Sequence, residues 1–132
     1  MAFSVKVTYQ GDMYCNINYI SGNYNVTTSV NLKDYFSPVD LLAGALSSCT
    51  VSMIASTIES KNLPVNARNV SMETEVLSAN HKVNGFKTVI KITDSGKLSD
   101  KDKAVIEAAA KSCPVKAALS PDLDIEYNYR YE

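Results

Sequence analysis

The chain has 132 residues, 45% hydrophobic and 20% charged, which is ordinary for one soluble globular domain over residues 1–132. Apolar content this high, with a formal net charge of −1, excludes general disorder. The balance of 13 basic against 14 acidic residues also argues against a nucleic-acid-binding protein, which would usually carry a strongly basic patch.

No stretch of the chain approaches 18 apolar residues, so we expect no transmembrane helix and no membrane partner. The first residues lack the charged start and apolar core of a signal peptide, which predicts a cytoplasmic protein. The odd number and wide spacing of Cys15, Cys49 and Cys113 argue against a disulfide scaffold. In a reducing compartment these cysteines are either core residues or reactive groups.

Alternating residues in the first third predict an antiparallel meander of three strands, separated by turns at residues 10–12 and 21–23. The three rows are Phe3, Val5, Val7 and Tyr9; Met13, Cys15, Ile17 and Tyr19; and Tyr24, Val26, Thr28 and Val30. We interpret Cys15 as a core residue, because free cysteine is among the most buried residue types.

A long helix is predicted to begin at Ser37-Pro38, where Ser37 can cap the helix and Pro38 suits its first position. Nothing charged occurs from Leu41 to Ile58, and the residues are apolar or small on every side, which predicts a helix buried on every side. A helix of roughly 22 to 25 residues would be about 35 Å long. One small domain can hardly surround it, so we expect a partner subunit to cover part of it.

The remaining chain predicts a hairpin, two helices and a final strand. Alternation over residues 70–76 and 86–92 indicates the hairpin, and Ser99 with Asp102 forms a capping box for the second helix. Pro114 should end that helix near Ser112 and begin a short one. With a strand over residues 123–131, the order is βββ-α-ββ-α-α-β, an α+β fold.

Two cysteines could carry chemistry. Cys113 precedes Pro114 and is therefore the expected N-cap of the short helix, where unpaired N–H groups lower a thiol pKa and raise reactivity. Cys49 lies in the long helix, where burial of free cysteine favours a core role. Four hydroxyl residues flank Cys49 and are polar for a core helix: Ser47, Ser48, Thr50 and Ser52.

Other chemistries lack support in the sequence. The sole histidine, His81, sits in a predicted turn, and three scattered cysteines do not make a zinc site. No nucleophile elbow supports a Ser-His-Asp triad, and no glycine-rich phosphate loop supports a nucleotide site. The aromatic row of Tyr127, Tyr129 and Tyr131 favours sheet packing over a stacking platform.

Two segments together resemble a known family. Residues 37–50, SPVDLLAGALSSCT, resemble the start of the central helix in the OsmC/Ohr family, whose pattern is Pro, an acidic residue, Leu, small residues and Cys. Residues 112–119, SCPVKAAL, resemble the family's second motif, a Cys-Pro pair that opens an apolar helix. The order and spacing of the two motifs fit this family of osmotically inducible and organic hydroperoxide resistance proteins.

The resemblance implies an OsmC-like fold with a long buried central helix, in an intertwined homodimer. It also implies a thiol-dependent peroxidase without a cofactor, which reduces small organic hydroperoxides and is reset by a dithiol reductant. Cys49 would be the peroxidatic cysteine and Cys113 the resolving one. Their reaction would pass through a Cys49 sulfenate to a Cys49–Cys113 disulfide.

Two positions depart from the family pattern. The family's activating arginine lies in the N-terminal strands, but this chain has no arginine before Arg68, which leaves Lys6 and Lys33 as candidate cations. Asp40 is the candidate acidic residue and precedes Cys49 by nine positions. Nine residues turn a regular helix by about 900°, so Asp40 could assist only from a bent helix start or across a dimer.

Two other interpretations remain open. The chain could be a non-catalytic dimer of the same fold that binds a small apolar ligand in an interface pocket, and the missing arginine favours this reading. It could also be an α+β structural module with core cysteines. The separation of the Cys49 and Cys113 sulfur atoms distinguishes redox chemistry from the core reading.

Overall fold

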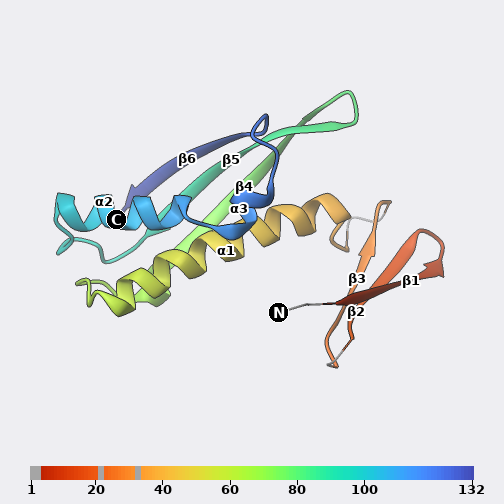
Figure 1. Ribbon diagram of the computed structural model, residues 1–132, viewed down its shortest axis with the longest axis horizontal. Coiled ribbons are helices and arrows are strands. Elements are labelled where there is room, and N and C mark those ends of the chain that lie inside the picture. Colours follow the sequence, from red (N-terminus) through yellow and green to blue (C-terminus); the bar gives the residue numbers. More distant parts are fainter. Residues whose placement is uncertain (1–3, 21–22, 32–33) are drawn as a thin grey trace. The chain divides into compact units, whose positions relative to one another are not determined.

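The structure is a computed structural model that describes residues 4–20, 23–31 and 34–132. Its elements follow the expected order of three strands, a helix, two strands, two helices and a strand, which confirms the α+β prediction (Figure 1). The chain forms two compact units, residues 1–42 and 43–132. The assignment of a single domain to residues 1–132 stays a prediction.

The first unit contains a three-stranded antiparallel sheet in the order β1-β2-β3, which confirms the predicted meander. Its strands are β1 (Val5–Gly11), β2 (Tyr14–Tyr19) and β3 (Asn25–Ser29). Phe3 and the Ser21-Gly22 part of a predicted turn lie outside the described residues. The apolar side chains of β1 are exposed, with Val5 at 61% and Val7 at 57%.

Helix α1 (Pro38–Ser60) has 23 residues and begins where the sequence predicts. Ser37 caps it: the Asp40 N–H donates to Ser37 Oγ at 3.1 Å, and the Ser37 N–H donates to Asp40 Oδ2 at 2.9 Å. These reciprocal bonds satisfy two backbone donors at the helix start and position Pro38 in the first turn.

Helix α1 is buried along one side only, so the expectation of burial on every side is wrong for the single chain. The buried residues are Ala43, Leu46, Thr50, Ile54 and Ile58. A second line of small residues is exposed, namely Gly44, Ser48, Ser52 and Ser56. The reason is geometric, because one sheet can cover only one stripe of a helix.

Helix α1 also corrects the expectation that no segment qualifies as a membrane span. By length and composition it is long and apolar enough to cross a membrane, since its serine and threonine residues interrupt the apolar run without adding charge. One such helix is weak evidence, because a core helix of a soluble protein passes the same test. The packing of Ile54 and Ile58 in the core favours the core-helix interpretation.

The second unit is built on a three-stranded sheet in the order β4-β5-β6. Strands β4 (Val70–Ala79) and β5 (Lys82–Ile92) form the predicted antiparallel hairpin, and β6 (Asp124–Tyr131) pairs with β5 in parallel. A short 3-10 helix, η1 (Ala67–Asn69), precedes β4. Helices α2 (Asp100–Lys111) and α3 (Pro114–Ala118) connect β5 to β6.

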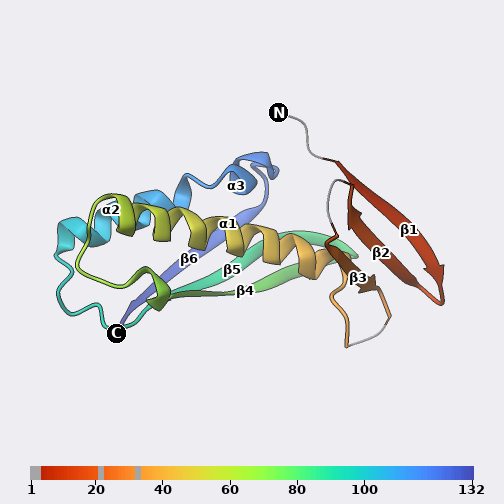
Figure 2. The ribbon, with the colours of Figure 1, turned by 90° about the horizontal axis from the view of Figure 1, so that it is seen from below.

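Helices α1 and α2 lie along the same face of this sheet (Figures 1 and 2). Between them and the strands is a core of eight buried residues: Ile54, Ile58, Val70, Ile90, Ile92, Leu98, Ile106 and Ala110. Helix α2 begins with the predicted capping box of Ser99 and Asp102. The burial of Ile106 and Ala110 confirms that this side of α2 faces inward.

At Gly85, β5 leaves no room for a side chain against β6. A Cβ atom there would collide with the backbone carbonyl oxygen of Asp124, its register partner. We expect Gly85→Ala to lower the free energy of unfolding by roughly 1–3 kcal/mol, because the strand backbone must shift. Urea denaturation measures this loss. Gly96→Ala is the control, since its Cβ would meet nothing within 4 Å, and an equal loss in both variants would contradict the prediction.

Candidate functional site

Cys113 caps the N-terminus of α3, as the sequence predicts. Its Sγ accepts the N–H of Lys116 at 3.5 Å, and Pro114 occupies the first helical position. Proline has no N–H to donate, so the donors that face the sulfur come from later residues of the turn. The side chain of Cys113 is 1% exposed. The local sequence therefore directs backbone N–H groups at a buried sulfur atom.

Cys49 comes from the middle of α1, and its thiol lies close enough to that of Cys113 for each to shift the pKa of the other. Cys49 is only partly buried, whereas Cys113 is buried, and all three cysteines of the chain are reduced. The structure therefore brings together two of the three site residues that the sequence singles out. Two thiols that interact directly can interconvert with a disulfide after a local adjustment.

Thr50 is a member of this site to which the sequence analysis gave no role of its own. Its side chain is fully buried on α1, its hydroxyl donates to the Leu46 carbonyl at 2.8 Å, and its presence lowers the pKa of Cys113. The signal was available, because a cluster of hydroxyl residues around Cys49 is unusual for a core helix. Which of these hydroxyl groups acts on Cys113 depends on which side of α1 faces α3.

A polar row crosses the sheet beneath the otherwise apolar core. Thr74, Thr88 and Tyr127 are neighbours in the register of β4, β5 and β6. The hydroxyls of Thr74 and Ser47 are 2.6 Å apart, which links this row to α1. The charge of Cys113 acts on Tyr127, which links the row to the thiol pair. These polar groups of the second unit thus lie at one level of the sheet.

The pKa values of the two thiols are shifted in opposite directions. Burial raises the pKa of Cys49, and its interaction with Cys113 raises that pKa further, against an opposing effect of the Val115 N–H. Burial alone would also raise the pKa of Cys113. Interactions with Cys49, the N–H groups of Lys116 and Val115, and Thr50 outweigh burial and bring the Cys113 pKa below that of an ordinary thiol.

Beside the site, β6 carries the predicted tyrosine row as a packed stack. The rings of Tyr127 and Tyr129 are 6.5 Å apart and those of Tyr129 and Tyr131 are 6.4 Å apart. Tyr131 donates to Glu107 Oε2 at 3.2 Å, whereas the buried hydroxyl oxygens of Tyr127 and Tyr129 have no hydrogen-bond partner among the described residues. This confirms that the row serves sheet packing.

The tyrosine stack makes the free energy of unfolding depend on pH in the alkaline range. Burial raises the pKa of Tyr129 to about 12, assisted by the charges of Glu107 and Tyr127. An unfolded tyrosine ionises near pH 10, so between about pH 10 and 12 the unfolded chain loses a proton that the folded chain keeps. The stability is complete below that window and falls as pH rises through it. We expect Tyr129→Phe to reduce this fall in urea denaturation.

The same substitution should not destabilise the chain at pH 7, because it removes a buried hydroxyl that has no partner. Tyr24→Phe is the matched control, since Tyr24 is 82% exposed. A Tyr129→Phe chain whose stability declines above pH 10 as steeply as that of the native chain would contradict the assignment.

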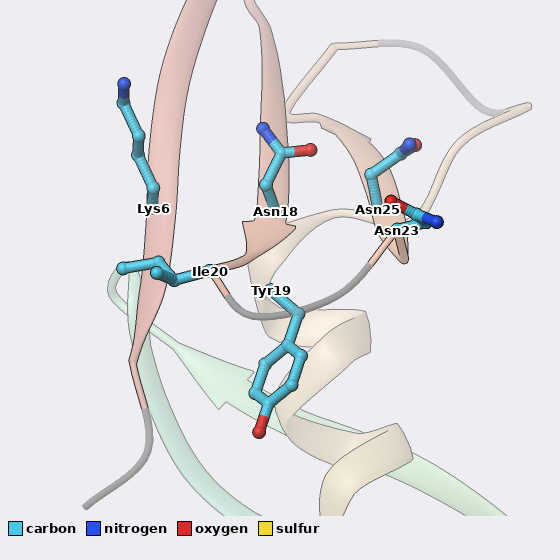
Figure 3. Close-up of a pocket in the computed structure, with 6 residues that line it drawn as sticks. All are labelled: Lys6, Asn18, Tyr19, Ile20, Asn23 and Asn25. Carbon is cyan, nitrogen blue, oxygen red and sulfur yellow. The ribbon is translucent and has the colours of Figure 1, made fainter.

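The other predicted site residues lie elsewhere. Asp40 is exposed in the first turn of α1, where its carboxylate caps the helix, and its catalytic role stays a prediction. Lys6 is exposed on β1 and lines a hollow of about 460 Å³ with residues of the first unit (Figure 3). Lys33 lies outside the described residues. Cys15 is only partly buried on β2, because it belongs to a small sheet whose side chains are mostly accessible.

Within residues 4–20, 23–31 and 34–132, no three His, Cys, Asp or Glu side chains are grouped so that they could hold a metal ion. The chemistry that the described groups can perform is thiol chemistry at Cys49 and Cys113.

Sequence comparison identifies one protein family. The sequence pattern of OsmC-like proteins matches residues 31–128, most of the chain and both cysteines of the pair. No curated protein sequence matches this chain.

Solved structures of similar fold cover the whole chain. A Psychrobacter arcticus protein whose name links it to osmotic stress and the detoxification response has 25% identity and a TM-score of 0.85, covering 98% of this chain and 96% of its own. An OsmC-like protein from Mycoplasma pneumoniae has 15% identity and a TM-score of 0.84, with coverage of 99% and 97%. The organic hydroperoxide resistance protein OhrB of Bacillus subtilis has 16% identity and a TM-score of 0.63, with coverage of 97% and 98%.

Proposed function

Because this chain belongs to the OsmC-like protein family, we propose that it is a thiol-dependent peroxidase that reduces organic hydroperoxides through Cys49 and Cys113. The observation that carries the proposal is the direct interaction of the two thiols, contributed by α1 and by the start of α3. A core cysteine needs no second cysteine against it, whereas a peroxidase that closes a disulfide does. Similar folds with organic hydroperoxide resistance in their names support the same activity.

The proposed cycle uses only protein thiols. The Cys49 thiolate attacks the terminal peroxide oxygen and the O–O bond breaks, which releases an alcohol and leaves a sulfenic acid on Cys49. Cys113 then attacks the Cys49 sulfur, a disulfide forms and water leaves. A dithiol reductant restores both thiols by exchange. Cys49 takes the first step because it is the less buried of the two.

We further propose that the active protein is a homodimer. OsmC/Ohr family proteins are usually dimers. In the single chain, the exposed side of α1 carries small residues and no charge from Leu41 to Ile58, a surface that suits close packing against another helix. The first unit adds exposed apolar side chains, including Tyr9 at 61% and Phe36 at 61%. Burial of such surfaces is the main driving force of association.

The proposed peroxidase should prefer alkyl hydroperoxides to hydrogen peroxide. Met53 lies one helical turn further along α1 from Cys49 and supplies an apolar side chain on that side of the helix. Each methylene that an alkyl group buries there contributes about 0.8 kcal/mol, so a small alkyl chain favours its peroxide by tenfold or more. Steady-state kcat/KM for tert-butyl hydroperoxide and hydrogen peroxide, with dithiothreitol as the reductant, measures this ratio.

Equal values of kcat/KM for the two peroxides would contradict the expected preference for alkyl hydroperoxides. Met53→Leu, which keeps the volume and apolar character near Cys49, serves as a matched control and should retain the preference.

The alternative function is a non-catalytic dimer that binds a small apolar ligand at an interface pocket. The observation that favours it is the lack of an arginine before Arg68 to hold the thiolate of Cys49. This alternative predicts no turnover with any of several dithiols and a Cys49 that resists alkylation at neutral pH. The peroxidase predicts the opposite in both assays.

A further inference from the structure

We propose that the tyrosine stack of β6 is an electron-transfer path, and that Tyr131 with Glu107 is its one-electron outlet. A radical formed at the thiol site would be quenched by an electron from Tyr131, whose proton passes to Glu107. This function goes beyond the two-electron reduction of a hydroperoxide. It concerns the single-electron oxidants that form when ferrous iron splits a hydroperoxide, and it does not require peroxidase turnover.

The stack is a continuous row of aromatic rings. Tyr127, Tyr129 and Tyr131 lie on one face of β6 because they alternate in sequence. Neighbouring ring planes differ by only 12° and 14°, and their centroids are 6.5 and 6.4 Å apart, within the range of interacting aromatic pairs. All three rings pack against the apolar core. Electrons pass readily between aromatic rings at this separation, so the row can carry an oxidising equivalent.

Helix α2 lies over the stack with a charged row of matching spacing. Lys103, Glu107 and Lys111 recur every four residues and therefore share one side of the helix. Four helical residues advance by about 6 Å and two strand residues by about 6.6 Å, so the two rows stay in step. The Lys103 ammonium is 4.8 Å from the Tyr131 ring centroid, and that of Lys111 is 5.9 Å from the Tyr127 centroid.

Among the described residues, a single phenol of the stack has a proton acceptor. Tyr131 donates to Glu107 Oε2 at 3.2 Å, within reach for proton transfer to a carboxylate. The buried hydroxyl oxygens of Tyr127 and Tyr129 have no partner. An oxidised phenol must release its proton, and the two lysines over the rings disfavour a positive charge that stays there. The oxidising equivalent therefore comes to rest on Tyr131.

The other end of the stack lies at the thiol site. Lys111, which covers Tyr127, is the last residue of α2, and Cys113 follows two residues later as the cap of α3. Tyr127 also interacts electrostatically with Cys113. Strand β6 then runs away from this point to the C-terminus (Figure 1). Tyr131 near that end is partly exposed, so a reductant in solvent can reach it.

The oxidation step balances with an alkoxyl radical, RO•, as the oxidant. Ferrous iron gives one electron to ROOH, which yields RO• and hydroxide. RO• takes a hydrogen atom from the partly buried Cys49 thiol, which yields ROH and the thiyl radical Cys49–S•. An electron passes from Tyr131 along the stack to that sulfur, while the Tyr131 proton passes to Glu107. The products are Cys49–S⁻, the neutral radical Tyr131–O• and Glu107–COOH, so charge is conserved.

The reset needs one hydrogen atom from outside the protein. Glu107–COOH releases its proton to solvent, and Cys49–S⁻ takes one up. A hydrogen-atom donor such as ascorbate then converts Tyr131–O• back to the phenol and becomes the ascorbyl radical. In sum, RO• is reduced to ROH by one hydrogen atom of ascorbate, and both thiols are regained. The outlet thus protects the thiol site from radical damage.

The test generates tert-butoxyl radicals by thermal decomposition of di-tert-butyl hyponitrite, without oxygen, in a Cys15→Ser background. A nitrone spin trap captures the protein radicals, and peptide mapping by mass spectrometry locates the adducts. Because this source contains no hydroperoxide, the result is independent of peroxidase activity. We expect the trap on Tyr131 and little of it on Cys49. Tyr24, which is 82% exposed, reports direct attack by the radical and should be labelled equally in every variant.

Three variants test the outlet and its path. Tyr131→Phe keeps the ring but removes the phenol, and it should raise the Cys49 adduct several-fold. Glu107→Gln keeps a hydrogen-bond acceptor of the same size but cannot take up the proton, so it should raise the Cys49 adduct and remove that of Tyr131. Tyr129→Leu removes the middle ring and should do the same. Tyr24→Phe is the matched control and should leave the ratio of Cys49 to Tyr131 adducts unchanged.

Cys49→Ser separates electron transfer from direct attack on Tyr131. The outlet predicts that the Tyr131 adduct is lost in this variant, together with its dependence on Glu107 in the parent chain. A Tyr131 adduct at the native level in Cys49→Ser, or a Cys49 adduct that does not change in Tyr131→Phe and Glu107→Gln, would overturn the inference. Glu107→Gln preserves the stacked rings, so the comparison stands even if Tyr129→Leu folds poorly.

Discussion

Replacement of Cys49 by serine is expected to abolish hydroperoxide consumption, by roughly 10³-fold or more, as is usual for loss of a catalytic nucleophile. A serine hydroxyl is neither ionised at neutral pH nor oxidised by peroxide to an intermediate that Cys113 could attack. Cys113 remains in the variant but is 1% exposed and cannot take over the reaction. The measurement is turnover of tert-butyl hydroperoxide with dithiothreitol.

Cys15→Ser is the matched control for this loss, because it removes the cysteine that lies in the first unit on β2. It should retain the native rate. A Cys49→Ser chain that still consumes the peroxide, or a Cys15→Ser chain that does not, would show that Cys49 is not the reactive thiol.

A charge placed on the exposed side of α1 is expected to dissociate the proposed homodimer. Ser52 is exposed in the single chain, within the uncharged stretch of the helix. If a partner covers this side, Ser52→Glu buries an unpaired carboxylate, which costs several kcal/mol and raises the dimer dissociation constant by 100-fold or more. Sedimentation of the native chain and the variant at micromolar concentration measures the change.

Ser71→Glu is the matched control, because Ser71 is exposed on β4 opposite Lys91 and its carboxylate would stay in solvent. This variant should sediment like the native protein. A native chain that sediments as a folded monomer of about 14.4 kDa would refute the dimer.

The elements of the fold were predictable because their signals are local. Ser37-Pro38 and Ser99 with Asp102 are helix starts that depend on residues within one turn, and both form the expected caps. Pro114 likewise ends α2 and begins α3 through its own backbone chemistry. Alternation predicted the strands for the same reason. The parallel pairing of β6 with β5 was not predicted, because it depends on where a crossover connection returns the chain.

The burial of α1 was harder to predict from the sequence than the residues at which the helix begins and ends. A helix without charge from Leu41 to Ile58, with Ile54 on one side and Ser52 on another, satisfies a pattern for full burial, but a single sheet covers only the side of Ile54. The helix sequence shows that both sides of α1 are suited to burial, but it does not show whether the same chain or a second chain covers them. The exposed side of α1 is therefore the strongest structural reason to expect a second subunit.

The two cysteines of the site could be predicted from the sequence, whereas the residues around them were harder to predict. Cys113 could be assigned as a cap from Pro114 alone, since that argument is local. The resemblance to a family paired it with Cys49. The contribution of Thr50 was not predictable, because a helix sequence does not say which hydroxyl faces a sulfur contributed 63 residues later. Asp40 met the sequence pattern, but its observed bonds are those of a helix cap.

The central claim is that Cys49 and Cys113 act together on a hydroperoxide, and one measurement tests it most directly. The reduced protein is treated with one equivalent of tert-butyl hydroperoxide, digested without reduction and mapped by mass spectrometry, while tert-butanol is quantified. The account predicts one Cys49–Cys113 disulfide for each tert-butanol released, with Cys15 still reduced. Three reduced cysteines, or a dominant disulfide that contains Cys15, would contradict it.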